Sequence, residues 1–270
     1  MSEPAHEPNP ESAGPARPGW RRVLLQRHRW LIFVLPFIVF MLVGSLEPKP
    51  PEVGDASGWL PAWTSIPYQY YPWVYTIKLV LTVAAVVFVL PGYREFPFRV
   101  SPLAILVGVA GIVVWVGFCQ LGLEQRLLGP IGLGSLVDLG SRSAFNPFKE
   151  LRALPAYWAW GFLAVRFFGL VVVVAVIEEV FLRGFVMRFV IDGQWWTVPF
   201  GKVSVAAVLA GTLVPMLMHP AELFAAAVWF SLITLLMVKT KNLWDCVVAH
   251  AVTNLLLGVY VVLSNEWHLM

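Results

Sequence analysis

The residues best suited to chemistry are acids, histidines and an amide that interrupt apolar runs in the second half of the chain. They form three short patterns, Glu178-Glu179-x-x-x-Arg183, a single His219, and His250-x-x-x-Asn254. Polar groups inside lipid cost several kcal/mol unless they have partners, so each of them is a candidate functional residue. The earlier apolar runs are nearly free of such groups and are expected to form a scaffold or the walls of a cavity.

The adjacent glutamates point in different directions if they lie on a helix. Glu179 and Arg183 are one turn apart on one face, which favours an ion pair. Glu178 points about 100° away from Glu179, so one carboxylate can be neutralised while the other faces a cavity. A partly desolvated Glu178 would suit general-base activation of water. An ordinary Glu–Arg pair at the membrane exit, with Glu178 reaching water, remains the alternative.

His250 and Asn254 also lie one turn apart on one helical face. Both can donate hydrogen bonds, and together they could stabilise a developing oxyanion or orient a substrate carbonyl. An interhelical polar clamp is the alternative for this pair. His219 lies directly before Pro220, and its alternative is an interfacial histidine that caps a helix broken by proline. Acid, imidazole and amide are the groups that amide hydrolysis needs to activate water and stabilise the tetrahedral intermediate.

The elements that must position these groups are membrane helices. The chain has 270 residues, of which 59% are hydrophobic and 13% charged, and its mean hydropathy is +0.74. A water-soluble protein of this size could not bury so much apolar surface, so a cytosolic globular enzyme is excluded. The net charge of +3 is small and scattered, which argues against a nucleic-acid partner. Cys119 and Cys246 both lie in apolar runs and are too few for a disulfide framework.

We expect an all-α, polytopic transmembrane helical bundle. A span needs about 20 mostly apolar residues, and continuous rather than alternating apolar runs favour helices over a barrel. Seven runs qualify, several of them at the short end, so we expect about seven spans within a range of six to eight. Lys78 and Arg166, near the outer ends of their spans, are expected to reach water along the helix surface. The runs are 30–46, 73–90, 103–121, 158–180, 203–218, 223–238 and 243–263.

The chain divides into three parts by composition. Residues 1–29 are expected to be a disordered, basic N-terminal tail, residues 30–155 the first spans with their outer loops, and residues 156–270 a catalytic transmembrane region. Lys and Arg number twelve in the segments that lie inside when the N-terminus is cytoplasmic, and five in the outer ones, which favours that orientation. We expect an integral protein of the bacterial inner (plasma) membrane. The twelve are Arg17, Arg21, Arg22, Arg27, Arg29, Arg94, Arg99, Arg183, Arg188, Lys202, Lys239 and Lys241, and the five are Lys49, Arg126, Arg142, Lys149 and Arg152.

The three polar patterns resemble, in order and approximate separation, those of the CPBP family, the CAAX prenyl endopeptidase-like intramembrane proteases. The resemblance covers about residues 158–263 and departs at Pro215, where the family usually has Phe in a Phe-x-x-x-His motif. The roles that it implies are a water-activating base at Glu178 helped by His219, an oxyanion site at His250 and Asn254, and a geometry-holding pair at Glu179 and Arg183.

The family's naming as metalloproteases points to a metal cofactor, Zn²⁺ if one is present. Two histidines and a glutamate, His219, His250 and Glu178, could form a three-ligand zinc site with an open water position. The chain has no His-Glu-x-x-His motif, and the same groups can work as a metal-free, glutamate-driven hydrolase. Metal dependence therefore stays open at this point.

These features predict an intramembrane endopeptidase that hydrolyses a peptide bond of a membrane-associated protein or peptide with glutamate- and histidine-activated water. Its expected partners are membrane lipid and a peptide or lipidated-protein substrate, which would enter a cavity among the last four spans near the cytoplasmic side. CAAX-type processing follows only from family analogy. The alternatives are a catalytically inactive immunity or scaffold protein, and a small proton-coupled transporter that uses the same buried groups.

The hydrolase hypothesis requires the side chains of Glu178, His219 and His250 to converge within a few ångströms. Glu178 is expected near the inner end of its span. If the next helix starts near Val203, His219 lies about 24 Å along it, which is too deep to meet the others. That helix must then bend, begin later, or follow an inner loop that dips into the membrane.

Overall fold

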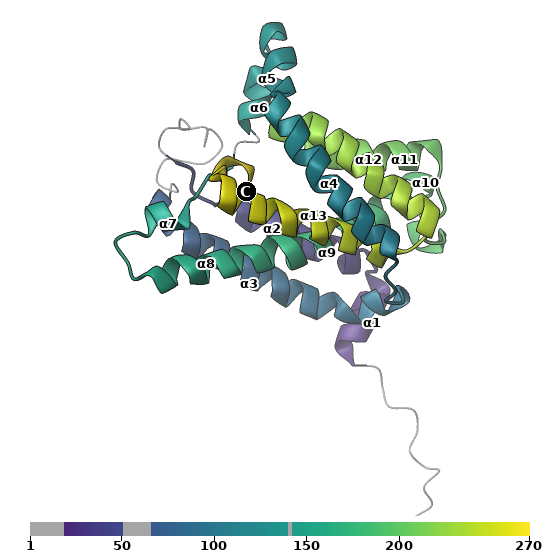
Figure 1. Ribbon diagram of the computed structural model, residues 1–270. Helices are drawn as coiled ribbons and strands as arrows, with labels where there is room; N and C mark the ends of the chain where they lie inside the picture. The colour runs from purple at the N-terminus through teal and green to yellow at the C-terminus, as the bar shows by residue number, and fades with distance from the viewer. Residues whose placement is uncertain (1–18, 51–65, 140–141) are drawn as a thin grey trace, which may run out of the picture.

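The computed structural model describes residues 19–50, 66–139 and 142–270. Within these ranges the chain forms helices and connecting turns, with no strand. Figure 1 shows the longer helices lying side by side in a bundle. The all-α polytopic fold is thereby confirmed, and its long apolar helices identify an integral membrane protein. Residues 1–18 of the expected tail, with Arg17, lie outside the described ranges.

The bundle begins with a bent pair of helices, α1 (Trp20–Arg27) and α2 (Trp30–Gly44), whose axes differ by 92°. The prediction of a disordered tail is therefore wrong for the residues of α1. An isolated helix of eight residues is unstable in water, so α1 depends on packing. Arg21 supplies one anchor, because its Nε donates to the carbonyl oxygen of Phe88 at 2.7 Å.

Two long helices follow, α3 (Tyr71–Val89) and α4 (Pro102–Leu121). One 3₁₀ turn, η3 (Tyr68–Tyr70), leads into α3, and a second, η4 (Leu90–Glu95), follows it. Short helices then connect α4 to the next span, and α5 and α6 project from the end of α4 in Figure 1. They are α5 (Leu123–Leu128), η5 (Gly129–Ile131), α6 (Gly134–Leu139) and α7 (Pro147–Glu150).

The next span is one continuous helix, Ala156–Ile191, of 36 residues. At 1.5 Å per residue it is about 54 Å long, well beyond the thickness of a hydrocarbon core. The expected end of this span at Val180 is therefore too early. Two of its segments, η6 and η7, are wide π-helical turns that flank the two glutamates. The segments are α8 (Ala156–Phe168), η6 (Gly169–Val174), α9 (Ala175–Glu179), η7 (Val180–Val186) and α10 (Met187–Ile191).

The chain then turns back through η8 (Trp195–Thr197) into α11 (Val205–Leu217). After η9 (Pro220–Glu222) it continues with α12 (Leu223–Thr240) and α13 (Leu243–Ser264), and η10 (Trp267–Leu269) lies beyond α13.

Five helices of the described chain are long and apolar enough to cross a membrane, and six if the bent pair of α1 and α2 counts as one span. Six lies at the lower limit of the expected range. The candidate that falls short is 203–218, because α11 has only 13 helical residues. A helix of that length covers about 20 Å, less than the hydrocarbon thickness.

The length of the Ala156–Ile191 helix also explains how His219 reaches the middle of the bundle. From Glu178 to Ile191 this helix rises about 20 Å. The helix α11 packs back along α10 and η7 over a similar length, so its end returns to the level of Glu178. His219 therefore lies at the depth of Glu178, because the loop before α11 lies beyond Ile191. That loop does not have to dip into the membrane.

Glycines allow α4 to approach α12 and α13 closely. A Cβ at Gly111 would lie 2.3 Å from Cζ3 of Trp229 and 2.4 Å from Oγ1 of Thr253. Small residues permit this kind of helix crossing in membrane bundles. Figure 1 shows α4 crossing over α12 and α13.

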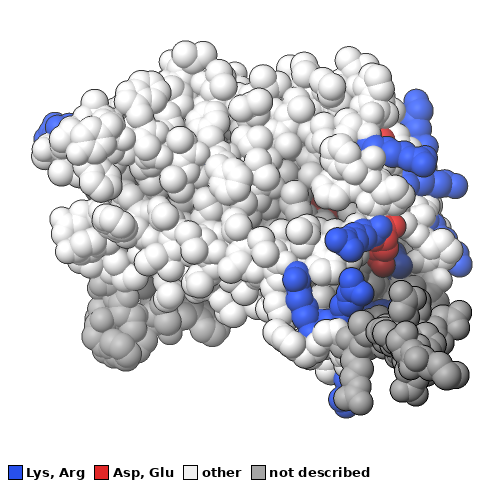
Figure 2. All heavy atoms as spheres, turned by 90° about the horizontal axis from the view of Figure 1, so that it is seen from below, with Lys and Arg blue, Asp and Glu red and all other residues white. Residues whose placement is uncertain are grey.

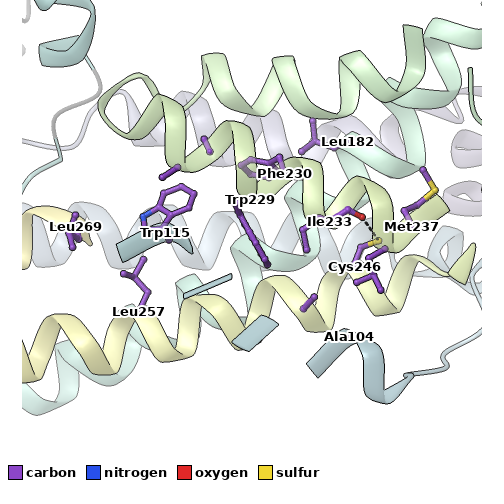
Figure 3. Close-up of a cluster of buried hydrophobic side chains, with 14 of the residues drawn as sticks. Ala104, Trp115, Leu182, Trp229, Phe230, Ile233, Met237, Cys246, Leu257 and Leu269 are labelled. Carbon is purple, nitrogen blue, oxygen red and sulfur yellow. Dashed lines mark hydrogen bonds between the residues drawn. The ribbon is translucent and has the colours of Figure 1, made fainter. Parts of the chain in front are cut away.

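A buried apolar cluster fills the space among α4, η7, α12 and α13 (Figure 3). Trp229 and Phe230 of α12 are both 1% exposed and form its centre. Cys246 of α13 lies in the same cluster, where it is fully buried and packs as a small apolar side chain. The polar groups described next lie against this cluster.

Candidate active site

Glu178 and Glu179 lie on the short α-helical segment α9, between the two π-helical turns. Both side chains are buried, Glu179 completely. Oε2 of Glu179 lies 3.2 Å from Nε of Arg183, so the ion pair expected from their spacing is confirmed. The two π turns change the helical register on either side of the pair, as is common near functional sites.

Arg183 lies inside the bundle rather than in an inner loop. Its side chain is fully buried, and it also donates to the carbonyl oxygen of Gly211 at 3.1 Å. Arg183 would be an inner-loop cation only if the helix ended at Val180, whereas the helix continues to Ile191. Removing Arg183 leaves eleven inner cations against five, so the bias toward a cytoplasmic N-terminus keeps its sign.

His250 joins both glutamates. Its Nδ1 lies 2.9 Å from Oε1 of Glu179, and its Nε2 lies 3.9 Å from Oε2 of Glu178. Because a carboxylate accepts, the short contact places a proton on Nδ1 and directs Nε2 toward Glu178. The sequence spacing gave no indication of this contact, since 71 residues separate the two partners.

Asn254 lies one turn beyond His250 on α13 and is held by a backbone group. Its Nδ2 donates to the carbonyl oxygen of Leu170 at 2.8 Å. Leu170 belongs to the π turn η6, where the hydrogen bonds shift from the i+4 to the i+5 donor and a carbonyl can be left for another partner. The second hydrogen of the amide is not used by this bond.

His219 lies between α11 and η9 with its ring fixed on two sides. Its Nδ1 lies 2.8 Å from the carbonyl oxygen of Pro215, so Nδ1 carries a proton and Nε2 is free to accept in the neutral ring. The ring stands edge-on to Trp115, with centroids 5.7 Å apart, and 5.5 Å from the centroid of Phe230. His219 thus contacts aromatic rings from α4 and α12. This chain has Pro215 at the position of the Phe in the Phe-x-x-x-His motif.

Four of the six predicted site residues line one small cavity of about 60 Å³ inside the bundle. They are Glu178, His219, His250 and Asn254. The other two, Glu179 and Arg183, lie behind His250 and do not line it. Since a water molecule needs about 10–15 Å³ of such volume, the cavity can hold a few water molecules but no peptide segment.

The cavity lining includes residues that the sequence patterns did not identify. Trp115 comes from α4, which was expected only to form a wall, and its Nε1 has no hydrogen-bond partner within the described ranges. Arg142 also lines the cavity and pairs with Glu222 at 3.1 Å. Leu269 and Met270 line the cavity as well, and no periodic pattern in the sequence marks them.

The residues do not fit the zinc site considered from the sequence. Across residues 19–50, 66–139 and 142–270, no group of three or more His, Cys, Asp or Glu side chains is arranged to hold a metal ion. Nδ1 of His250 faces Glu179 and Nδ1 of His219 faces a backbone carbonyl, which leaves Nε2 as the free nitrogen of each ring. The side chains of Glu178, His219 and His250 nevertheless do not come together as a three-ligand set, and no step below uses a metal.

Comparison with known proteins supports the relationship proposed from the motifs. Residues 159–256 match the family model described as Rce1-like, Type II CAAX prenyl endopeptidase Rce1-like. This segment runs from α8 to α13 and contains all six predicted site residues. The resemblance to the CAAX prenyl endopeptidase-like family is thereby confirmed, and the match supports a protease of the endopeptidase class. No curated protein and no solved structure gave a significant match to the chain.

Proposed function

We propose that this protein is an intramembrane endopeptidase that hydrolyses a peptide bond with water activated by Glu178 and His219. The observation that carries the proposal is the shared cavity, in which a carboxylate, two imidazoles and an amide meet inside an apolar bundle. Oε2 of Glu178 is buried without a hydrogen-bond partner among the described residues, which suits a group that receives a water molecule. The match to the Rce1-like family model agrees with this chemistry.

In the first step, a water molecule lies between the Glu178 carboxylate and Nε2 of His219, both of which accept its hydrogens. Glu178 removes one proton as the water oxygen attacks the carbonyl carbon of the peptide bond. A carbon–oxygen bond forms, and the carbonyl oxygen takes the electron pair as an oxyanion.

The oxyanion is stabilised from α13. An imidazolium at His250 donates from Nε2, and Asn254 donates with the hydrogen that its bond to Leu170 leaves free. Glu179 balances the charge of this imidazolium through Nδ1 and is itself held by Arg183. Such a chain of a carboxylate and an oriented imidazole is a recurring arrangement in hydrolases.

In the last step the tetrahedral intermediate collapses and the carbon–nitrogen bond breaks. The proton held by Glu178 passes to the leaving amine nitrogen, so the products are a carboxylic acid and an amine. Because the cavity holds only a few water molecules, a substrate segment must displace part of the lining before the reaction.

The substrate is a membrane-associated protein or peptide, with CAAX-type processing as the family analogue. The proposed location is a bacterial inner membrane with the N-terminus in the cytoplasm, an orientation that the excess of Lys and Arg in the inner segments favours. Membrane lipid then surrounds the bundle.

The test is a cleavage assay with the purified full chain in detergent, using an S-farnesylated CAAX peptide and the same peptide without the lipid. Products are identified by mass spectrometry, with and without a chelator. Wild type is expected to release a defined peptide, Glu178→Gln to release none, and the exposed-carboxylate control Glu150→Gln to behave as wild type.

Cleavage that survives Glu178→Gln at the wild-type rate would contradict the proposal. Failure of wild type to cut either peptide or a panel of membrane-protein termini would favour an inactive scaffold instead. Proton flux into proteoliposomes that Glu178→Gln removes would favour transport.

A further inference from the structure

A second cavity, which we name the basic pocket, lies at the junction of α1, α2, η4, α10 and η8. Its volume is about 440 Å³, and it shares no lining residue with the candidate active site. Four arginines and one acid line it, so the lining carries a strong positive charge. The charged lining residues are Arg22, Arg29, Arg94, Arg188 and Glu95.

Arg188 is a fixed, buried guanidinium on one wall of the basic pocket. Only 7% of it is exposed, and its Nε donates to the carbonyl oxygen of Val198 at 2.9 Å. Its guanidinium lies 5.4 Å from the ring centroid of Trp195, and Nη1 lies 3.4 Å from Oε1 of Glu95. The protein therefore holds one cation of the pocket in place with four separate contacts, since Nη1 also donates to Gly184.

The other three arginines are exposed and are not neutralised by acids. In the part of the chain that the structure describes, Arg22, Arg29 and Arg94 have no ion-pair partner. Arg22 lies on α1, Arg29 in the turn before α2 and Arg94 on η4, and all three line the same hollow. The close packing at Gly92 supports this arrangement, because a Cβ there would lie 2.5 Å from Cγ2 of Ile32.

The basic pocket lies where phospholipid headgroups would be. The 92° bend turns α1 across the end of α2, so α1 runs along the membrane surface if α2 crosses the membrane. Trp20 and Trp196, both near the pocket, are 73% and 45% exposed, as expected for aromatic side chains at the interface. Figure 2 shows Lys and Arg gathered at this end of the molecule, while the opposite end is almost free of them in that view.

We propose that the basic pocket binds the phosphate headgroup of an anionic membrane phospholipid. Guanidinium groups bind phosphate oxygens with paired, charge-assisted hydrogen bonds, and three of the arginines form no ion pair with an acid of the described residues. Clusters of basic side chains at the cytoplasmic surface attract anionic lipids, and the aromatic and apolar residues of the lining suit the glycerol region. The site is independent of the proposed hydrolysis, because no catalytic candidate lines it.

The test measures binding of short-chain phosphatidylglycerol to the purified full chain in a neutral detergent, by native mass spectrometry and by thermal stabilisation. Short-chain phosphatidylcholine and inorganic phosphate serve as comparison probes. Phosphatidylglycerol is expected to bind and to raise the melting temperature, since a ligand of the folded state stabilises it. Phosphatidylcholine and inorganic phosphate at equal concentration are expected to have little effect.

The variant Arg22→Gln/Arg29→Gln/Arg94→Gln is expected to weaken phosphatidylglycerol binding by at least about tenfold. The matched control Arg99→Gln/Lys202→Gln/Lys239→Gln removes the same charge from exposed residues outside the pocket and should retain most of the affinity. Arg29→Gln alone, a single exposed change, should give a smaller loss in the same direction if the triple variant folds poorly.

Three results would overturn the proposal. An equal loss in the control variant would mean that overall charge, not the pocket, attracts the lipid. Equal binding of phosphatidylcholine would remove the requirement for an anionic headgroup. Full stabilisation by inorganic phosphate alone would assign the pocket to a soluble anion. Glu178→Gln should bind phosphatidylglycerol as wild type does, whatever its cleavage activity.

Discussion

The active-site cavity and the basic pocket hold charged side chains in opposite ways. In the cavity of about 60 Å³, each ionisable group faces a specific partner, as His250 faces Glu179 and Glu178. In the pocket of about 440 Å³, three arginines are exposed and unpaired within the described ranges. The function of the cavity therefore depends on the identity of single groups, whereas that of the pocket depends on summed charge. Substitutions should therefore act all-or-none in the cavity and gradually in the pocket.

The largest effect is expected from Glu178→Gln. The amide has the same shape as the carboxylate but cannot take a proton from water, so the cleavage rate should fall by about 10²–10⁴-fold. Steady-state cleavage of the farnesylated peptide measures this, and the melting temperature serves as the folding control. A loss below tenfold would mean that both cavities respond gradually, and the contrast between them would be lost.

The next largest effect is expected from Arg183→Met, which leaves the carboxylate of Glu179 buried without its cation. Breaking a buried pair in this way costs about 3–5 kcal/mol, so folded protein should be lost at a lower temperature or denaturant concentration. Unfolding in detergent, followed by circular dichroism, measures the change. The double variant Glu179→Gln/Arg183→Met should recover part of the loss, and no recovery would show that the pair is not the cause.

A smaller loss of stability is expected from Gly111→Ala, where α4 closes the site. The added methyl would meet Trp229 and Thr253 at less than 3 Å, and overpacking of this kind costs about 1–3 kcal/mol. Gly117→Ala on the same helix is the matched control, because no atom lies within 4 Å of a Cβ there. Its unfolding midpoint should match or exceed that of wild type. Equal losses in both variants would contradict the close packing.

The smallest effect is expected from Glu95→Gln in the basic pocket. This side chain is 48% exposed, and such surface pairs contribute about 0–1 kcal/mol, so the unfolding midpoint should hardly change. Phosphatidylglycerol should bind slightly more tightly, because the one acid that lines the pocket among the described residues loses its charge. Weaker binding would show that Glu95 orients Arg188 for the ligand.

Much of the fold follows from the apolar runs. The predictions fail where they depend on the length of a helix or on which partner a buried charged side chain has. The run at 203–218 looks like a span, but the helix that it forms is too short, because its neighbour Ala156–Ile191 extends far beyond the expected end. Composition does not mark that extension, since Arg183 resembles a flanking cation until its buried pair with Glu179 is seen. Lys78 and Arg166 were likewise expected to reach water, but they are 4% and 1% exposed.

Those two buried cations have partners that lie far away in the sequence. Arg166 donates to the backbone oxygens of Phe145 and Met270, and Lys78 pairs with Glu47. Helical periodicity relates residues three or four positions apart, so it predicted the contact of Glu179 with Arg183. It could not predict that of His250 with Glu179, nor that Trp115 would line the cavity. The catalytic roles of the six site residues stay predictions until the cleavage assay is done.

The π turn Gly169–Val174 has a consequence for how this region tolerates change. Deleting one residue there would remove the wide turn and restore the ordinary hydrogen bonds to the i+4 donors, while α8 and Glu178 keep their relative faces. The oxygen of Leu170 would then be used within the helix and would no longer be left for Asn254. Exchanging one valine of the turn for isoleucine keeps the number of residues and hence the register. In this stretch the chain should tolerate substitutions of similar side chains but not a change in the number of residues.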